Sequence, residues 1–255
     1  MQGRAPFSRS VTIYCRADLR PLLADKRWAV VYVNNARLRG FFRFEKPFVS
    51  AFLAVNTEGD RAHPSTDVST DLTPERALEF VACALGSREI PVTIDSIMHW
   101  EAAAEVAERL QTGRVFIAGD AAHVMPPTGG FGGNTGVQDV HNLAWKLARV
   151  LTAEAPAALL ATYESERAPV ARLAVEQAYT RYVLRTDPSL DPARCEPLVH
   201  DLDIELGYVY RSGAIVEEGS DAGSAHSSPR ESRARPGSRA PHLWLKRRGQ
   251  RLSSL

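Results

Sequence analysis

Hydrophobic positions in the first hundred residues gather in short runs. The runs are rich in β-branched and aromatic residues, which is typical of strands. Four runs this close together predict an antiparallel or mixed sheet, because parallel neighbours need long crossover connections. The expected strands cover residues 10–15, 28–34, 38–44 and 48–55, with a fifth at 92–100 and a short helix between the first two at 17–23.

Apolar residues recur at helical spacing further along the chain. A capping hydroxyl, a proline and an acid at 73–75 predict a helix that ends at Gly86. A second helix is predicted over 137–151, and a third over 157–184, where Pro169 should end or kink its first part. The apolar face of the second helix consists of Val140, Leu143, Ala144, Leu147 and Leu151.

Three segments are harder to assign from their pattern. The Ala and Glu content of residues 101–110 favours a helix, whereas a hairpin through 111–113 into an apolar strand at 114–118 is the alternative. Residues 217–240 are rich in Ser, Gly, Ala and Arg, which predicts a disordered linker. Residues 242–245 look like the first strand of a further domain.

Composition excludes several classes of protein. The chain has 255 residues, of which 44% are hydrophobic, so a sizeable core is possible. No apolar run approaches the roughly 20 residues of a membrane span, and charged residues near the start argue against a signal peptide. The three cysteines lie far apart, so neither a disulfide framework nor a metal site is indicated. We therefore expect no membrane partner and a reducing, cytoplasmic setting.

The net charge of +1 conceals a basic segment. Residues 229–251 contain seven arginines, one lysine and one glutamate, and the rest of the chain is acidic on balance. A basic segment can bind nucleic acid. Here Pro, Ser and Gly are interspersed and stacking aromatic residues are nearly absent, which favours a solvated linker. We therefore expect no nucleic-acid partner.

Residues 114–136 combine the features of a ligand-binding loop. An apolar strand leads to Asp120, and a Pro-Pro turn, a loop with four glycines and a helix start follow. Glycines let the backbone approach a ligand closely, and a helix start presents N–H groups that favour an anion. The spacing departs from the dinucleotide-binding fingerprint, since Thr135 stands where a glycine is required, and the Walker pattern is absent. A glycine-rich surface loop without a ligand is the alternative.

The residues of this loop resemble a known motif. Gly-Asp-Ala-Ala-His at 119–123, Pro-Pro-Thr-Gly at 126–129 and Asn-Thr-Gly at 134–136 are similar to the second FAD-binding motif of class A flavoprotein aromatic monooxygenases. The resemblance covers roughly residues 8–185 and is closest to hydroxylases of polyketide and phenol-type substrates. It implies the para-hydroxybenzoate hydroxylase fold: a mixed antiparallel substrate-side sheet, an FAD-edge strand–loop–helix and C-terminal helices. It also implies a hairpin at 104–118, against local propensity.

The resemblance also implies a cofactor and a role for individual residues. Asp120 would bind the ribityl chain of FAD, and Pro127 with residues 129–135 would line the edge of the isoalloxazine ring. The co-substrates would be NAD(P)H and O2, and the substrate a small aromatic or polyketide-type molecule. The oligomeric state is not indicated. The candidate cofactor-binding residues are Gly119, Asp120, Pro127, Gly129, Gly130, Phe131, Gly132, Gly133, Asn134 and Thr135.

Members of that family also carry a Gly-x-Gly-x-x-Gly motif and a second Asp-Gly motif, and both are missing from these residues. We therefore interpret the chain as an incomplete fragment that binds FAD poorly alone. A non-catalytic truncated or split-gene product that needs a partner is the alternative to an independent enzyme. The expected regions are a substrate-binding sheet (1–103), a partial FAD-binding region with its following helices (104–184), a helical or strand extension (185–216), a disordered linker (217–240) and the start of a truncated thioredoxin-like domain (241–255).

Two further features have a structural and a functional interpretation. His123 follows Asp120 closely and invites a proton-transfer role. The sequence supplies no second catalytic partner, so a structural role is favoured and no catalytic residue is assigned. Phe41, Phe42 and Phe44 could line an aromatic pocket, but we expect them in the core of the sheet.

Overall fold

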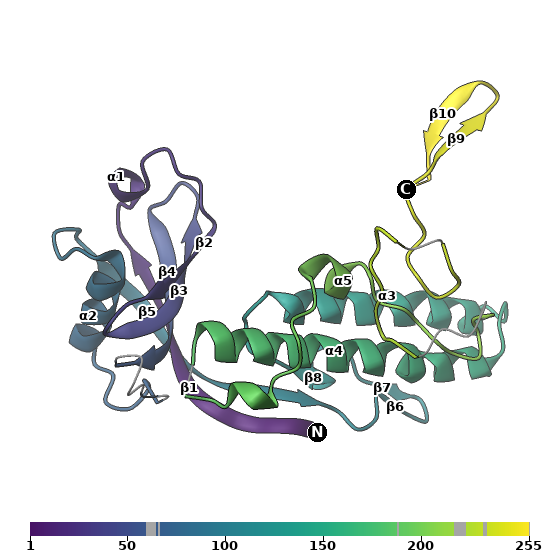
Figure 1. Cartoon of the computed structure of the whole chain (residues 1–255), viewed down its shortest axis with the longest axis horizontal. Coiled ribbons are helices and arrows are strands. Elements are labelled where there is room, and N and C mark those ends of the chain that lie inside the picture. The colour runs from purple at the N-terminus through teal and green to yellow at the C-terminus, as the bar shows by residue number, and fades with distance from the viewer. Residues whose placement is uncertain (60–64, 66, 188, 217–222, 232–233, 255) are drawn as a thin grey trace. The chain divides into compact units, whose positions relative to one another are not determined.

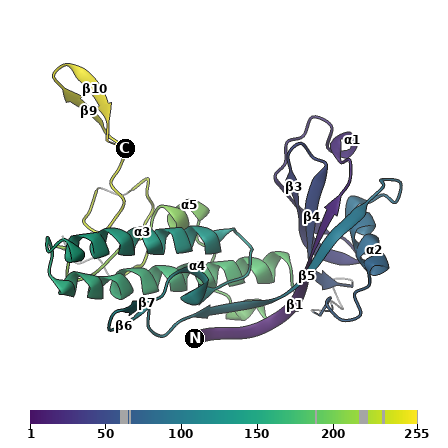
Figure 2. The same cartoon turned by 180° about the vertical axis from the view of Figure 1, so that it is seen from behind.

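The structure is a computed structural model, and it describes residues 1–59, 65, 67–187, 189–216, 223–231 and 234–254. The chain forms two compact units. The sheet unit comprises residues 4–104 and 179–195, and the helical unit comprises residues 1–3, 105–178 and 196–255. Figures 1 and 2 show the elements of both units from opposite sides.

The sheet unit follows the hydrophobic runs of the sequence. Its elements are β1 Gln2–Arg16, α1 Arg20–Leu23, β2 Val30–Asn34, β3 Leu38–Glu45, β4 Ser50–Glu58 and β5 Thr93–Val106. The order across the sheet is β2-β3-β4-β1-β5-β8, where β8 is His123–Val124. β1 pairs with β4, β2 with β3 and β3 with β4, all antiparallel. The antiparallel or mixed sheet predicted from the runs is confirmed.

One face of this sheet carries the apolar core of the unit. Ile13 of β1 is fully buried and belongs to the same cluster as Phe80 of α2 (Pro74–Leu85). The Thr73 side chain caps this helix by accepting a hydrogen bond from the N–H three residues later. Gly86 ends it with a φ of 71°, the left-handed conformation that favours glycine. Both predicted ends of this helix are confirmed.

The other face of the sheet carries a row of aromatic rings. Tyr32, Phe41, Phe52 and Tyr14 come from β2, β3, β4 and β1, and successive ring centroids lie 5.9, 6.1 and 5.4 Å apart. Phe42 lies in the core, whereas Phe41 does not. The expectation that Phe41 lies in the core is therefore wrong, because successive side chains of a strand point to opposite faces.

Arg39 of β3 is buried in the sheet unit, and no carboxylate of the described residues lies within ion-pair distance of it. Its side chain is 2% exposed, and its Nη1 donates one long hydrogen bond, of 3.5 Å, to Thr57 Oγ1. Among the described residues its Nη2 has no partner. Thr57 Oγ1 in turn donates to the carbonyl of Thr186 at 3.4 Å. Within the described part of the sheet unit, the Arg39 guanidinium is thus taken out of water with little compensation.

β5 continues well beyond its predicted end. Its last two residues pair with β8 (His123–Val124). Ala102, Ala104 and Val106 are buried, so burial follows the two-residue period of a strand. The helix favoured by the composition of residues 101–110 is therefore wrong. Pairing and alternate burial outweigh the helix propensity of Ala and Glu.

The hairpin implied by the family resemblance is present but short. β6 (Gln111–Thr112) pairs with β7 (Val115–Phe116). The apolar strand predicted over 114–118 is thus reduced to two paired residues. The residue after β7 is bonded to a helix instead of a strand. The hydroxyl of Tyr163, in the helix Thr162–Arg185, donates to the carbonyl of Ile117 at 2.8 Å.

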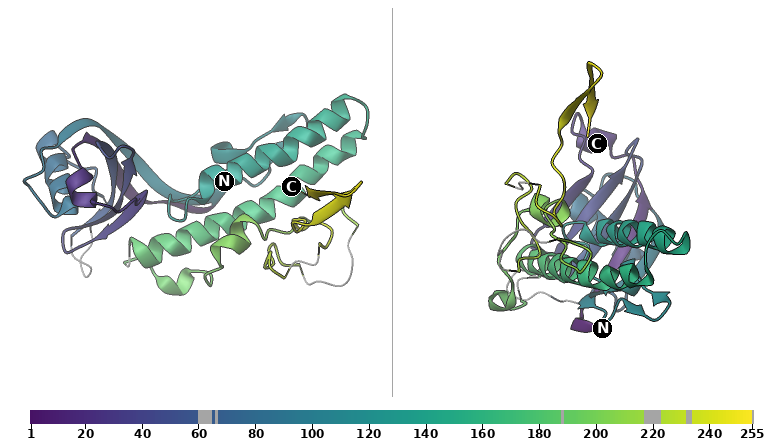
Figure 3. Two further views of the ribbon diagram at one scale, coloured as in Figure 1. Left: turned by 90° about the horizontal axis from the view of Figure 1, so that it is seen from above. Right: turned by 90° about the vertical axis from the view of Figure 1, so that its right-hand side faces the viewer.

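Two long helices, α3 (Phe131–Leu151) and α4 (Thr162–Arg185), lie side by side in Figures 1 and 3. α3 begins six residues earlier than predicted, because Gly130 adopts a φ of 72° and starts the helix there. The sequence predicts that Pro169 ends or kinks the helix; α4 continues through it, so of these two alternatives the helix end is wrong. A proline removes one backbone hydrogen bond, and the burial of neighbours such as Val170 offsets that loss.

The buried face of α3 is polar. Asp139, Asn142 and Lys146 are buried, whereas Val140 is 57% exposed and Leu151 is 81% exposed. The predicted apolar face is therefore wrong at Val140 and Leu151. Hydrophobic spacing locates a buried face only where apolar contacts hold the helix, and here charged groups bind α3 to α4.

The remaining elements are short. Of the linker predicted over 217–240, residues 217–222 and 232–233 lie outside the described residues. In the rest, the Ala225 carbonyl accepts from Val209 N–H at 2.9 Å. All residues of the final hairpin, β9 and β10, are exposed. The short elements are η1 Gly119–Ala121, η2 Ala157–Ala161, η3 Pro192–Arg194, α5 Asp201–Glu205, β9 Trp244–Arg247 and β10 Gln250–Ser253.

Candidate functional site

The Gly119–Ala121 turn, η1, packs directly on the second turn of α3. Gly119 has a φ of 59°, and a Cβ placed on Gly136 would lie 3.1 Å from the Gly119 Cα. Any larger residue at Gly136 would therefore push the turn away from the helix. Asp120 is the middle residue of this turn and is exposed. Two glycines thus fix where the Asp120 carboxylate is presented.

The start of α3 is open and carries no side-chain cap. Gly129 and Gly130 have φ values of 91° and 72°, and Gly130 is the residue that precedes the helix. The first N–H groups of a helix have no intrahelical acceptor, and Gly130 has no side chain to supply one. A Cβ placed on Gly133 would meet nothing within 4 Å. This end of α3 therefore offers N–H donors and space to a ligand.

The ten predicted residues divide by where their side chains lie. Phe131 is 1% exposed and belongs to an apolar cluster with Ala174 and Ala178 of α4. Thr135 is 4% exposed, and its hydroxyl donates to the Phe131 carbonyl at 2.8 Å. The side chains of these two residues are therefore not available to a ligand at the surface. The structure places the exposed residues of the predicted set at Asp120, Pro127, Gly130, Gly133 and Asn134.

A buried carboxylate lies beneath the turn. Asp139 of α3 is fully buried, and its Oδ2 accepts hydrogen bonds from the Gly119 N–H at 3.1 Å and from His123 Nε2 at 2.7 Å. Its Oδ1 accepts from Arg167 Nε at 2.7 Å. Arg167, on α4, also donates to the Tyr210 hydroxyl at 3.0 Å. One carboxylate therefore joins the turn, α3 and α4.

The charges of this network favour an ionised carboxylate. Burial by itself would raise the pKa of the Asp139 carboxyl, but the His123 hydrogen bond and the Arg167 guanidinium lower it below its ordinary value. Burial raises the pKa of Tyr210 to about 12, so its hydroxyl stays neutral near pH 7. The Asp139–Arg167 pair is thus a buried ion pair, closed on its outer side by a neutral hydroxyl.

A second buried ion pair joins the same two helices, with the positive and negative charges on the opposite helices from the first pair. Glu166 Oε2 accepts from Lys146 Nζ and from Asn142 Nδ2, each at 2.7 Å, and its Oε1 accepts from the Ser212 hydroxyl at 2.7 Å. Burial lowers the pKa of the Lys146 ammonium. Here α4 supplies the anion and α3 the cation, whereas α3 supplies the anion at Asp139–Arg167. The segment that carries Tyr210 and Ser212 closes both pairs.

His123 has the structural position favoured from the sequence. The ring of His123, a residue of strand β8, is buried and hydrogen-bonded to Asp139, and among the described residues its Nδ1 has no partner. Sequence reasoning missed Asp139 and Arg167 as parts of the site. The available signal was the polar spacing of Asp139, Asn142 and Lys146, which share one face of a helix that otherwise has an apolar stripe.

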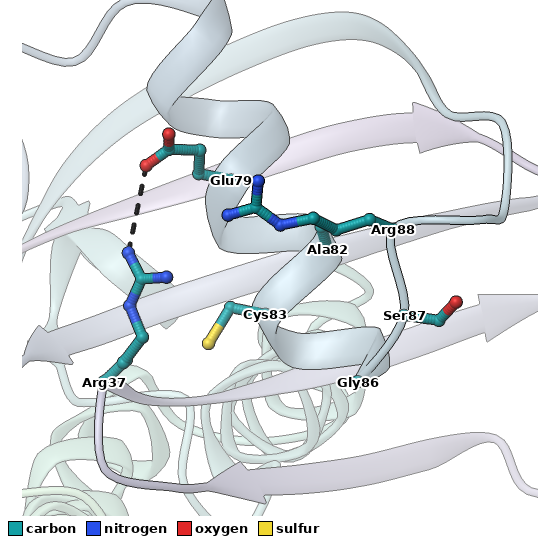
Figure 4. A pocket seen from close by; sticks show the side chains of 7 residues that line it. All are labelled: Arg37, Glu79, Ala82, Cys83, Gly86, Ser87 and Arg88. Carbon is teal, nitrogen blue, oxygen red and sulfur yellow. Dashed lines mark ion pairs between the residues drawn. The ribbon is translucent and has the colours of Figure 1, made fainter.

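The sheet unit has a hollow of its own, shown in Figure 4. Its volume is about 210 Å³, and it lies between the C-terminal end of α2 and the turn before β3. An ion pair of 3.8 Å between Arg37 and Glu79 crosses its rim. None of the ten candidate cofactor-binding residues lines it. The lining residues are Arg37, Glu79, Ala82, Cys83, Gly86, Ser87 and Arg88.

Comparison with known families decides the identity of the site. The family model for the FAD binding domain matches residues 1–178, more than two thirds of the chain. The chain belongs to the FAD binding domain family. The match includes η1, the glycine loop and both buried ion pairs up to Arg167. The resemblance expected from the motif at 119–136 is confirmed.

Relatives in this family are monooxygenases and hydroxylases. The chain is 52% identical over 249 residues to 4-methyl-5-nitrocatechol 5-monooxygenase of Burkholderia sp. This alignment covers 96% of the chain and 45% of the relative. It is 36% identical over 255 residues to tetracenomycin B2 monooxygenase-dioxygenase of Streptomyces olivaceus, covering 99% of the chain and 45% of the relative. The chain thus spans slightly less than half the length of the curated relatives it matches.

A solved structure confirms the fold class. The crystal structure of aklavinone-11 hydroxylase in a ternary complex with FAD and aklavinone matches with a TM-score of 0.88 and 36% identity, over 99% of this chain and 46% of that chain. The mixed sheet, glycine loop and following helices therefore belong to the fold of FAD-dependent hydroxylases. Within the described part of the chain, no helix is both long and apolar enough to cross a membrane.

The residues at η1 and the start of α3 fit the flavin end of FAD. An exposed carboxylate at Asp120 suits the hydroxyl groups of a ribityl chain, which are hydrogen-bond donors. The first turn of α3, which receives no side-chain cap at Gly130, and the open space over Gly133 suit a planar ring with acceptor atoms along its edge. Donors, acceptor and space are thus presented within one turn and one helix start.

Proposed function

We propose that this chain is part of an FAD-dependent monooxygenase that hydroxylates a small aromatic or polyketide-type molecule, with NAD(P)H and O2 as co-substrates. The observation that carries the proposal is the η1 turn, in which Asp120 is presented beside the uncapped start of α3. The names of the relatives support the substrate class. The proposal concerns the whole protein, because the chain spans less than half of those relatives.

In this proposal the residues of the chain hold the flavin and set the polarity around it. Asp120 accepts hydrogen bonds from the ribityl hydroxyls. The positive end of the α3 dipole faces the ring edge and stabilises negative charge there by roughly 0.3–1 kcal/mol. The flavin supplies the redox chemistry when it is bound, and the protein supplies position and electrostatics.

The sheet unit supports the aromatic class of substrate. The row from Tyr32 to Tyr14 presents four rings on the face that the core leaves open, and Tyr32 is 47% exposed. Aromatic rings recognise other aromatic rings by offset stacking and edge contacts. The scattered cysteines at 15, 83 and 195 support a cytoplasmic location as part of the same proposal.

Flavin titration of the chain tests this proposal. Riboflavin contains the ring and the ribityl chain without phosphate, whereas lumiflavin lacks the ribityl chain. We expect riboflavin and FAD to bind weakly and with similar affinity, measured by quenching of flavin fluorescence. Asp120→Ala should weaken riboflavin binding roughly tenfold, as expected for a lost charged hydrogen bond. Lumiflavin binding should not change.

The matched control is Glu108→Ala, which removes another exposed acid of the helical unit. It should leave all three flavins unaffected. If none of the three flavins binds at millimolar concentration, the proposal of a flavin site in this chain is refuted. Equal weakening of riboflavin and lumiflavin by Asp120→Ala would refute the assignment of Asp120 to the ribityl chain.

A further inference from the structure

We propose that Asp139 is a positioning residue that holds residues 119–123, which comprise the η1 turn and His123 of β8, and with them the Asp120 carboxylate, in the geometry that binds the flavin. The inference rests on the proposed function and names the residue beneath the site that sets it. Its basis is a single atom: Oδ2 of Asp139 accepts from the Gly119 N–H at 3.1 Å and from His123 Nε2 at 2.7 Å. These are the first and the last residues of the segment 119–123, and Asp120 lies between them.

The other oxygen of the carboxylate is engaged elsewhere. Oδ1 accepts from Arg167 Nε at 2.7 Å, and Arg167 is itself fixed by three further acceptors. Its Nη2 donates to the Thr135 carbonyl at 3.2 Å and to Gln138 Oε1 at 3.4 Å, and its Nη1 donates to the Tyr210 hydroxyl at 3.0 Å. Asp139 and Arg167 are both fully buried, so neither side chain is free to rotate.

The two carboxylate oxygens of Asp139 accept hydrogen bonds from different donors, so this position requires two acceptor oxygens. Asparagine has the same shape but only one acceptor oxygen. If its oxygen faces Gly119 and His123, its NH2 group points at the Arg167 guanidinium, and two donors oppose each other. If its oxygen faces Arg167, its NH2 group points at the Gly119 N–H. Asp139→Asn therefore preserves the side-chain volume but loses the hydrogen bonds of one carboxylate oxygen, either those to Gly119 and His123 or the one to Arg167.

The test uses Asp139→Asn with Glu166→Gln as the matched control. Glu166→Gln also removes one charge from a buried pair of the same two helices, but Glu166 contacts Asn142, Lys146 and Ser212 and bonds to no atom of the turn. Amide hydrogen exchange of the flavin-free chain is the first measurement. We expect exchange in residues 119–123 at least tenfold faster in Asp139→Asn and unchanged in Glu166→Gln. Equal exchange in both variants would overturn the proposal.

Coupling to Asp120 is the second measurement. Asp139→Asn should weaken riboflavin binding about as much as Asp120→Ala, and the double variant should be no weaker than Asp120→Ala alone, because both changes remove the same contact. Losses that multiply would show that Asp139 acts independently of Asp120 and would contradict the inference. If the wild-type chain binds no flavin, the proposed function fails, and hydrogen exchange still decides the role of Asp139.

A rescue variant covers the case in which Asp139→Asn does not fold. In Asp139→Asn/Arg167→Met the opposing guanidinium is gone, so the asparagine oxygen can turn to Gly119 and His123. We expect exchange in residues 119–123 within about threefold of the wild type. Fast exchange confined to these residues, with the remaining helices protected, would overturn the proposal.

Discussion

Replacing Arg39 by methionine should make the sheet unit more stable. Arg39 lies on β3 and is 2% exposed, with a single 3.5 Å hydrogen bond to Thr57 and no carboxylate within ion-pair distance among the described residues. A buried ion that lacks a good partner loses its hydration without an equivalent attraction. Methionine matches the length of the aliphatic stem and removes the charged group.

The expected gain follows from the loss of that penalty. Replacement of buried ion pairs by apolar residues of similar volume is often neutral or stabilises a protein by about 1–4 kcal/mol, and a buried charge without a partner lacks even the attraction that offsets its desolvation. The Thr57 hydrogen bond is long, so its loss subtracts less than about 0.5 kcal/mol. We therefore expect the free energy of unfolding to rise by roughly 1–3 kcal/mol in Arg39→Met.

Urea unfolding followed by circular dichroism measures this change. Arg43→Met is the control, because Arg43 lies four residues further along β3, on the same face, and is exposed. That substitution should change the free energy of unfolding by less than about 0.5 kcal/mol. A loss of stability in Arg39→Met, with an unchanged urea dependence, would refute the view that the buried guanidinium is uncompensated.

Three further outcomes follow from the helical unit. Tyr163→Phe should lower the free energy of unfolding by about 1–2 kcal/mol, because it removes the hydrogen bond to the Ile117 carbonyl; urea unfolding without such a loss would contradict that role. Gly133→Ala should raise stability by roughly 0.5–1 kcal/mol, since its Cβ meets nothing, yet weaken riboflavin binding by filling the open helix start; unaltered affinity would argue against the flavin lying there. The pKa values of Asp139 and Glu166 are lower in the folded chain than their ordinary values of 3.8 and 4.5, so their stabilisation is complete above about pH 5 and lost as the pH falls further. Acid unfolding monitored from pH 6 to 2 should therefore be shallower in Asp139→Asn/Glu166→Gln than in the wild type, and identical curves would count against both ion pairs.

The strands of the sheet unit and the ends of α2 could be predicted because their signals are local. β-branched runs, a capping threonine and a terminal glycine act within a few residues of themselves. The strand at Ala102–Val106 could not be predicted from its composition, since its state is decided by pairing with residues near His123. The short span of β7 has the same origin. Helix or strand propensity does not decide the structure of a segment whose backbone hydrogen bonds come from a strand elsewhere in the chain.

The site shows the same division. The glycine-rich loop and the helix start that follows it could be predicted from the sequence because a loop motif contains its own geometry. The ion pair of Asp139 with Arg167 could not, because it joins residues 28 apart in the chain and exists only once α3 lies against α4. Hydrophobic spacing pointed instead to Val140 as an inward residue. The domain divisions after residue 184 and the roles of the ten candidate residues stay predictions.

The opposite polarities of the two buried pairs give the helix pair a single allowed alignment. A purely apolar interface between α3 and α4 would tolerate displacement of one helix along the other, because one leucine can take the place of another in the same groove. Here a displacement by one turn, roughly 5.4 Å, would separate Asp139 from Arg167 and Lys146 from Glu166 together. Four charges would then lie buried and unpaired, at several kcal/mol each. The helices can dock only in the arrangement that brings Gly136 beneath Gly119, so assembly of the bundle and formation of the ligand-facing turn are one event.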